Sequence, residues 1–293
     1  MKIDVVKIVP FIKWAGGKRQ LIPEIKRRLP NNFDRDKNTY FEPFLGGGAL
    51  LFHLLPKQAV ISDIMYELVM SYRQVRDNVK DLMSKLDIYE EEHQKNPLKH
   101  YYEIRELDRD DIVYNALTDT DKAARMIYLN KSCFNGLYRV NKKGYFNVPF
   151  NHKQKVKTYD QQNLLNISKY LKNNKITILN LDFEEVVKKA KKGDFIFFDP
   201  PYDLLTDATF RGYNTEIFGE DGQKRLAKVF NELNDKGCNI LLCNYDTDLI
   251  RELYSDFHYD IVDIMRSINS KANNRKGKEV LIYNYDPYNY TIG

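Results

Sequence analysis

The segment 195–203, FIFFDPPYD, joins a run of apolar residues directly to a carboxylate, two prolines and a tyrosine. Proline has a fixed φ and no backbone N–H, so Asp199-Pro200-Pro201 offers carboxylate and carbonyl acceptors with few competing donors. Such a short, stiff edge of acceptors suits a group with two N–H bonds, such as an exocyclic amine. Tyr202 follows at once and could lie flat against a ring. The segment therefore indicates a site for an amino group on an aromatic ring, although a rigid strand end is the simpler alternative.

A second candidate site lies at 41–50, FEPFLGGGAL, where a strand, a glycine turn and a helix start follow one another. Glycines let the backbone approach a ligand closely, but many tight turns use glycine for conformational reasons alone. The run fits neither GxGxxG nor GxxxxGK[ST]. A cofactor that carries phosphates is therefore not the first choice.

Acidic residues follow several of the predicted strands. Asp63 lies 17 residues beyond Gly46, where a carboxylate can accept hydrogen bonds from both hydroxyls of a ribose. Asp182 follows another strand and, with Phe183, could face the adenine of a cofactor. Each of these two acids taken alone is more often a helix N-cap. Ligands of open α/β sheets bind at the carboxyl ends of strands, so the arrival of Gly46, Asp63, Asp182 and Asp199 at such ends favours a ligand site there.

The N-terminal segment 11–21, FIKWAGGKRQL, contains Trp14, the only tryptophan of the chain. A tryptophan beside two glycines can be plain packing next to a turn. It can also supply an aromatic wall for a cationic ligand. Lys18 follows at a predicted helix start and could reach a carboxylate.

The elements that must position these residues alternate between strands and helices. Nearly continuous apolar runs, typical of strands covered on both faces, predict strands at 39–44, 59–63, 175–180, 194–198, 238–244, 258–264 and 279–284. Helical patterns lie at 18–29, 48–55, 65–77, 183–192, 221–236 and 246–255. This alternation predicts an α/β layered sheet with parallel connections.

One interval, 67–174, breaks the alternation because it is mostly helical and charged. Within it, 137–148 has two short β-prone runs around NKKG, which predicts a hairpin. We expect 1–66 and 175–293 to form one catalytic domain, with 67–174 as an inserted recognition domain. The stretch 131–157 contains seven Lys/Arg and no Asp or Glu, and 265–278 contains five and none. Such segregated charge suits a phosphate-tracking surface, although solvated basic loops would look the same.

Composition excludes several classes of protein. The chain has 293 residues and a net charge of +5, enough for one large domain or two modest ones. Its three cysteines form no CxxC pair and its five histidines do not cluster, so we expect reduced cysteines and no metal site. No run approaches the length of a membrane span, and the N-terminus does not read as a signal peptide, so we expect a cytoplasmic protein without a membrane partner.

Together, KWAGGK, EPFLGGGAL, the SD pair, LDFEEV and DPPY occur in an order that resembles the Dam-type, α-group DNA adenine-N6 methyltransferases of bacteria and phage. The likeness runs essentially end to end. FNGLYRVNKKGYFNVPF at 134–150 is similar to that family's DNA-reading hairpin, and SKANNRKGKEVLI near the C-terminus is also similar. The resemblance implies a Rossmann-like, seven-stranded methyltransferase sheet with an inserted helical DNA-recognition domain that carries a β-hairpin.

The resemblance also implies the cofactor S-adenosylmethionine and methyl transfer to adenine N6 in double-stranded DNA after base flipping. Asp199, Pro200 and Tyr202 would be catalytic, and the cofactor site would be lined by Trp14, Gly17, Lys18, Phe44, Asp63, Asp182 and Asp199. Asp199 and the Pro200 carbonyl would accept the two N–H bonds of the amine, with no covalent intermediate and no metal. Tyr202 would stack on the base, a contact worth on the order of 1–3 kcal/mol.

The DNA-reading role is implied for the insert. Arg139 matches the family arginine that contacts guanine, and we expect the other DNA contacts from Lys13, Asn135, Leu137, Asn141 and Pro149. The resemblance suggests GATC as the target site. A cognate restriction endonuclease would be a partner by function rather than by stable contact.

Three other functions stay open on the residues alone. Cytosine N4 is also an exocyclic amine and would fit the Asp-Pro-Pro-Tyr edge. A DNA-binding relative without catalysis is disfavoured by the intact Asp199, Pro200 and Tyr202. A nicotinamide-dependent dehydrogenase is disfavoured by the missing GxGxxG.

Overall fold

The computed structural model describes residues 8–14, 16–203, 213–265 and 276–287. Contacts between Cα atoms divide the chain into two compact units. We call the set Met1–Gly17, Gly46–Leu55 and Asp63–Asn180 the helical unit, and the set Lys18–Leu45, Pro56–Ser62 and Leu181–Gly293 the sheet unit. The predicted functional boundaries 1–66, 67–174 and 175–293 stay a prediction.

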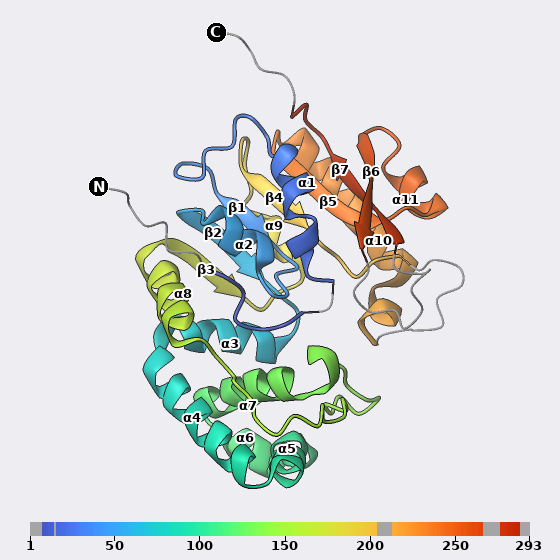
Figure 1. Cartoon of the computed structure of the whole chain (residues 1–293). Helices are drawn as coiled ribbons and strands as arrows, with labels where there is room; N and C mark the ends of the chain where they lie inside the picture. Colours follow the sequence, from blue (N-terminus) through green and yellow to red (C-terminus); the bar gives the residue numbers. More distant parts are fainter. Residues whose placement is uncertain (1–7, 15, 204–212, 266–275, 288–293) are drawn as a thin grey trace. The chain divides into compact units, whose positions relative to one another are not determined.

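The seven predicted strands are confirmed and form one sheet in the order β3-β2-β1-β4-β5-β7-β6 (Figure 1). Their bounds are β1 Tyr40–Glu42, β2 Gln58–Ser62, β3 Lys175–Leu179, β4 Phe195–Phe198, β5 Asn239–Tyr245, β6 His258–Met265 and β7 Lys276–Tyr283. All four residues of β4 are buried, and so are the first six of β5. Burial on both faces explains why these strands are continuous apolar runs in the sequence.

The direction of the strands agrees with the prediction only in part. β1 pairs in parallel with β2 and β4, and β4 pairs in parallel with β5. β7 lies between β5 and β6 and is antiparallel to both, which departs from the predicted parallel connections. The chain between β6 and β7 is only the ten residues 266–275, and a parallel crossover needs a dozen or more.

Helices of the sheet unit are short except for one. Their bounds are η1 Lys18–Gln20, α1 Ile22–Arg27, α9 Phe183–Val187, α10 Tyr213–Asp235 and α11 Asp248–Leu253. The backbone of α10 breaks at Gly219, with φ 47° and ψ −164°. The regular part of this helix therefore begins after Gly219, which agrees with the helix predicted at 221–236. Phe230 of α10 packs against Tyr254 and Phe257, with ring centroids 5.2 and 4.6 Å away.

The helical unit contains the helices predicted between 48 and 174. Their bounds are α2 Ala49–Leu54, α3 Tyr66–Asp77, α4 Val79–Lys95, α5 Pro97–Glu106, η2 Leu107–Arg109, α6 Asp111–Ala116, α7 Asp119–Ser132, η3 Phe134–Gly136 and α8 Gln161–Asn173. α3 packs against α7 and α8, and α4 packs against α5 and α7. α7 begins with a capping box in which Thr118 and Asp121 exchange hydrogen bonds.

The predicted turn at NKKG is present, but without regular strands. Isolated antiparallel bridges join Val140 to Phe146 and Cys133 to Phe150. Asn141 Oδ1 accepts the N–H groups of Lys143 and Tyr145 at 2.9 and 3.1 Å and so closes the turn. We call residues 137–149 the basic turn. The second basic stretch predicted, 265–278, lies largely outside the described residues.

All three cysteines are free and buried. Burial raises the pKa of the Cys133 and Cys238 thiols to about 11 each, so both stay protonated at neutral pH. Burial likewise raises the pKa of Cys243 well above its ordinary value.

Two fully buried tyrosines, Tyr254 and Tyr101, generate a stability prediction. The Tyr254 hydroxyl has no hydrogen-bond partner among the described residues, whereas the Tyr101 hydroxyl donates to the Val148 carbonyl at 2.8 Å. An unsatisfied buried polar group costs about 1–3 kcal/mol, so Tyr254→Phe should raise the free energy of unfolding. Tyr101→Phe, the matched control, should lower it by about 1 kcal/mol. Urea denaturation of both variants measures this, and a destabilised Tyr254→Phe would contradict it.

Candidate active site

The Asp199 carboxylate stands where the buried strand β4 ends. Its side chain is 20% exposed, and Pro200 behind it is buried. The following loop is held by the side-chain amides of Gln223 and Asn244, two buried residues that were not singled out from the sequence. Gln223 Nε2 donates to the Pro201 carbonyl at 2.9 Å, and Asn244 Nδ2 donates to Gln223 Oε1 at 3.0 Å. These bonds fix the path of the acceptor edge.

Lys18 approaches Asp199 directly. Its Nζ lies 2.7 Å from Asp199 Oδ1 and 4.6 Å from the centroid of the Tyr202 ring. Burial alone would lower the pKa of Lys18, but Asp199, with smaller contributions from Cys243 and Glu279, outweighs it and raises that pKa. Lys18 is therefore a cation at this site. The sequence predicted that Lys18 could reach a carboxylate, and the carboxylate that it contacts is Asp199.

The ring of Tyr202 is fixed at two places. Its hydroxyl donates to Glu279 Oε2 of β7 at 2.7 Å, and its ring meets Tyr245 edge to face with centroids 4.7 Å apart. Glu279 is 7% exposed and was not singled out from the sequence. Glu279 and Asn244 could have been singled out from the sequence, because each is a polar residue within an otherwise apolar strand. A ring held in this way presents a pre-oriented flat surface.

Burial raises the pKa of Asp199 to about 6, although the nearby Lys18 ammonium opposes the shift. The carboxyl group is therefore ionised above about pH 6 and can then act only as an acceptor. Burial also keeps the neighbouring Cys243 thiol neutral. The site thus pairs the Asp199 carboxylate with one buried cation, Lys18, next to a second acid, Glu279.

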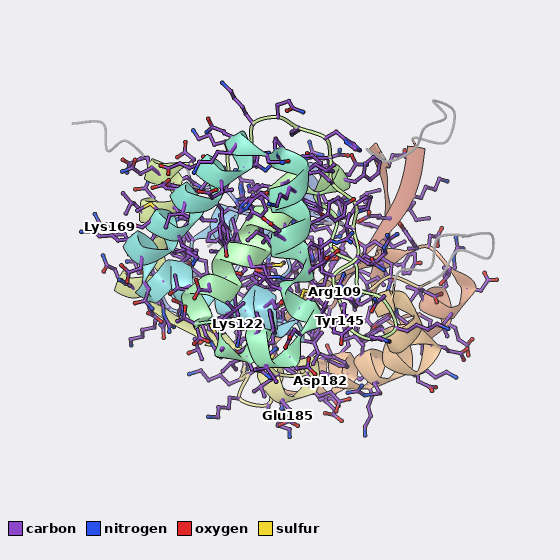
Figure 2. All side chains as sticks on the ribbon, turned by 90° about the horizontal axis from the view of Figure 1, so that it is seen from below. Arg109, Lys122, Tyr145, Lys169, Asp182 and Glu185 are labelled. Atoms are coloured by element: carbon purple, nitrogen blue, oxygen red, sulfur yellow. The ribbon has the colours of Figure 1, made fainter. Side chains whose placement is uncertain are left out.

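Phe44 and Asp182, two further residues predicted to line the cofactor site, also lie in the sheet unit. Phe44 stacks on Phe183 with centroids 5.4 Å apart and planes 28° apart, which makes a partly exposed aromatic platform. Asp182 caps α9 by accepting the N–H of Glu184, as the N-cap alternative predicted. Its Oδ1 also pairs with Arg225 at 2.9 Å. Figure 2 shows Asp182 close to Glu185, a residue of α9.

The helical unit brings Trp14, Gly46 and Asp63 together. Gly46 has φ +48°, and a Cβ there would lie 2.6 Å from Trp14 Cδ1, so only glycine fits against the indole. Asp63 Oδ2 accepts the Gly46 N–H at 3.0 Å, and Oδ1 accepts the N–H of Met65 at 3.0 Å. Met65 rather than Asp63 is the N-cap of α3, so the N-cap alternative is wrong for Asp63. Gly17 closes the turn after Trp14 by donating to its carbonyl at 3.2 Å.

Burial raises the pKa of the Asp63 carboxyl, while its bonds to Met65 and Gly46 oppose the shift. A carboxylate has about four acceptor positions, of which two backbone N–H groups use two. Asp63 can therefore still accept bonds from ligand hydroxyls. This acceptor and the Trp14 wall are the features of the helical unit that suit a nucleoside.

The predicted DNA-contacting residues surround the basic turn. Lys13 exchanges two hydrogen bonds with Asn130 through its backbone and packs against Gly136, which follows Asn135. Asn135 is exposed and left-handed, with φ 56°. Leu137 is half-buried and Pro149 is exposed.

Arg139 and Asn141 lie on the turn itself. Arg139 is exposed, and its Nε donates to Asn147 Oδ1 at 2.7 Å. The Asn141 side-chain oxygen is occupied by the turn, which leaves its amide N–H₂ for a ligand. Arg139 is thus one of three exposed charged side chains of the turn, with Lys142 and Lys143, and the one that carries a planar guanidinium.

The described residues were also compared with the requirements of a metal site and of a membrane-spanning helix. No group of three or more His, Cys, Asp or Glu there could hold a metal ion. Likewise, no helix in the described part of the chain is long and apolar enough to cross a membrane.

The Lys18–Asp199 ion pair generates a titration prediction. Removing the ammonium in Lys18→Met should raise the pKa of Asp199 further above 6, because Lys18 is the main group that opposes the effect of burial on it. Lys18→Arg keeps a positive charge and should leave the pKa closer to that of the unchanged protein. Carboxyl ¹³C NMR of aspartate-labelled protein, assigned with Asp199→Asn, measures each value. An Asp199 pKa that does not move in Lys18→Met would contradict the geometry.

Comparisons with known proteins agree with these features. The family of D12 class N6 adenine-specific DNA methyltransferases matches residues 14–268. The Type II methyltransferase M1.LlaDCHI of Lactococcus lactis subsp. cremoris is 40% identical over 282 residues, which cover 96% of each chain. The Type II methyltransferase M.MjaIII of Methanocaldococcus jannaschii is 40% identical over 295 residues, covering 96% of this chain and 100% of that protein.

A third relative, the DNA adenine methylase of Haemophilus influenzae, is 32% identical over 276 residues, which cover 93% of this chain and 92% of that protein. The resemblance seen in the sequence is thereby confirmed. On the extent of these matches, the chain belongs to the D12 class N6 adenine-specific DNA methyltransferase family.

Proposed function

We propose that this chain transfers a methyl group from S-adenosylmethionine to the N6 amine of adenine in double-stranded DNA, within GATC. The observation that carries the proposal is the Asp199 carboxylate, which ends a buried strand beside the fixed ring of Tyr202. An ionised acceptor next to a flat aromatic surface suits an amine on a planar base. The target base has to leave the duplex to reach such a site, which requires base flipping.

The chemistry at Asp199 and Pro200 is positional. Asp199 accepts one N–H of the amine and the Pro200 carbonyl accepts the other, which directs the nitrogen lone pair away from both acceptors. As the amine becomes positively charged on methylation, the carboxylate stabilises that charge. The entering amine has to compete with the Lys18 ammonium, which lies 2.7 Å from the same carboxylate.

The residues present fit S-adenosylmethionine, which supplies an electrophilic methyl group. Asp63 retains acceptor positions for the ribose hydroxyls, and Trp14 and Gly17 lie in the same unit. In the sheet unit, Phe44 on Phe183 offers a platform for an adenine ring, and Asp182 directly precedes Phe183 in the chain. Lys18 and Asp199 complete the proposed set of cofactor contacts.

We assign recognition of the DNA sequence to Arg139, because it is exposed on the basic turn and carries a planar guanidinium. A bidentate arginine–guanine pair is the commonest specific contact in the major groove. Lys13, Asn135, Leu137, Asn141 and Pro149 would supply the neighbouring contacts to bases and phosphates.

The direct test is base analysis of DNA from an unmethylated host that expresses the chain. We expect N6-methyladenine within GATC. Asp199→Asn should lower the rate of methyl transfer by about 10²-fold or more, since it removes the charge while keeping the shape. Asp248→Asn, an exposed acid of the same unit, is the control and should retain activity. Only N4-methylcytosine, or full activity in Asp199→Asn, would refute the proposal, and absence of any modification would favour a DNA-binding relative without catalysis.

Arg139 generates a specificity prediction. Arg139→Ala should cost about 1–3 kcal/mol of discrimination at one guanine, while other positions keep their preference. Lys142→Ala, an exposed lysine of the same turn, should instead weaken binding to all DNA sequences and lower the salt dependence. Methylation rates on a set of single-base variants of the target separate these outcomes. Equal losses on every variant in Arg139→Ala would make it a phosphate contact.

A further inference from the structure

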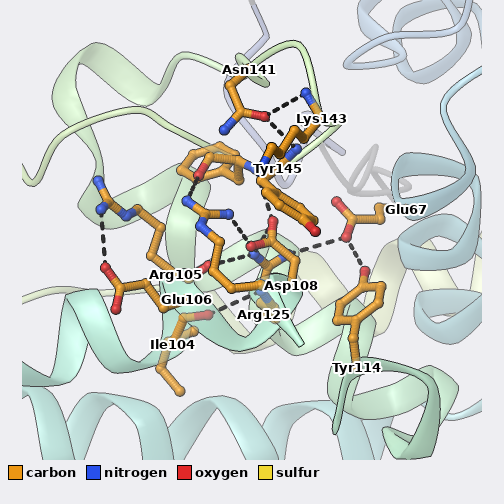
Figure 3. Close-up of polar contacts among 12 residues, drawn as sticks. Glu67, Ile104, Arg105, Glu106, Asp108, Tyr114, Arg125, Asn141, Lys143 and Tyr145 are labelled. Atoms are coloured by element: carbon orange, nitrogen blue, oxygen red, sulfur yellow. Dashed lines mark hydrogen bonds and ion pairs between the residues drawn. The ribbon is translucent and has the colours of Figure 1, made fainter. Parts of the chain in front are cut away.

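A buried cluster of charges in the helical unit takes no part in the function proposed above. Arg125 of α7 is 1% exposed and lies between two acids, with NH1 3.1 Å from Glu67 Oε1 and NH2 2.7 Å from Asp108 Oδ2 (Figure 3). It also donates to the carbonyls of Ile104 and Arg105 at 3.0 and 2.8 Å. A buried charge of this kind is retained only when every member of its network is paired.

Asp108 and its neighbour Arg109 hold one side of the basic turn. Asp108 Oδ2 accepts the N–H of Phe146 at 2.8 Å, and Arg109 NH2 donates to the Phe146 carbonyl at 2.6 Å. The Arg109 guanidinium lies 5.0 Å from the centroid of the Tyr145 ring, next to which Figure 2 places it. Both polar groups of the Phe146 backbone are thus fixed by charged side chains.

Glu67 holds the other side of the turn through Tyr138. The Tyr138 hydroxyl donates to Glu67 Oε2 at 3.1 Å. The ring of Tyr138 stacks on Trp14, with centroids 5.9 Å apart and planes 29° apart, and meets the ring of Phe146 at 5.5 Å. Tyr138, itself a residue of the basic turn, therefore contacts Glu67, Phe146 and Trp14 at once.

Trp14 and Glu67 both lie close to residues that are proposed to hold the cofactor. Trp14 lies against Gly46, whose N–H is held by Asp63. Glu67 is the second residue of α3, and Asp63 lies just before the N-cap Met65. The short segment before α3 and the first turn of that helix thus bring one carboxylate to the glycine turn and another to Tyr138. Interiors packed this closely transmit small displacements.

We propose that Tyr138, held by Glu67, is a positioning residue through which cofactor binding and DNA reading strengthen each other. This inference rests on the proposed function, since it takes Trp14, Gly46 and Asp63 as cofactor residues and the basic turn as the DNA reader. A ligand that orders Trp14 also orders Tyr138, and so the turn that carries Arg139. Such coupling is reciprocal, so DNA tightens cofactor binding by the same factor.

The chain offers a matched pair of variants for the test. Tyr138→Phe and Tyr114→Phe each remove one phenol hydroxyl that donates to Glu67. The ring of Tyr114, on α6, lies beside Lys122 and Arg125 instead of Trp14. Loss of a hydrogen bond to Glu67 is common to both variants. Only Tyr138→Phe releases a ring that belongs to the basic turn and stacks on Trp14.

The experiment measures the dissociation constant of S-adenosylhomocysteine, which cannot react, with and without a duplex that carries the sequence methylated by the unchanged protein. The ratio of the two constants is the coupling factor. We expect a factor above about fivefold for the unchanged protein. Tyr138→Phe should reduce it by about threefold to tenfold, and Tyr114→Phe should keep it within about twofold.

Two outcomes would overturn this inference while leaving the proposed function intact. They are a coupling factor of one in a protein that methylates adenine, or equal coupling losses in the two tyrosine variants. A protein that does not modify DNA would refute the proposed function, and this inference with it. Thermal denaturation of both variants shows whether they lose similar stability, as removal of the same type of bond predicts.

Discussion

The structure depends on one electrostatic constraint, the placement of the Asp199 carboxylate at the end of a strand that water does not reach. Burial raises the pKa of this group to about 6 and so makes its ionised form costly. Lys18 offsets part of that cost from 2.7 Å away. An acid that is ionised near neutral pH, yet poorly solvated, interacts strongly with any N–H donor that reaches it. The rest of the sheet unit serves to keep this acceptor in place.

The supporting residues follow from the requirement that buried polar groups be paired. Gln223 and Asn244 hold the loop after Asp199, and Glu279 holds the hydroxyl of Tyr202. β7 can carry Glu279 to this site because it enters the sheet antiparallel, next to β5. The antiparallel strand β7 therefore contributes a residue that orients the aromatic ring.

The sequence predicted the parts of the fold that depend on local pattern. All seven strands lay in apolar runs, because strands that are buried in a sheet have apolar side chains. Asp63, Asp182 and Asp199 were correctly placed after strands, because the end of each apolar run marks the end of the strand. The direction of β7 could not be predicted from its composition, since the same apolar run suits either pairing. The contacts of Lys18 with Asp199 and of Tyr202 with Glu279 could not be predicted either, because each joins residues that are far apart in the chain. Asn244 and Glu279 were visible as polar residues in apolar strands, but nothing local said what they hold.

The state of the three thiols bears on how the motion of this protein can be observed. Cys133, Cys238 and Cys243 are all buried, and burial keeps each thiol in its protonated, unreactive form. A maleimide dye would therefore react selectively with one new cysteine at an exposed position such as Lys142. The native cysteines need not be replaced, so fluorescence changes in the basic turn can be followed in an otherwise unaltered chain.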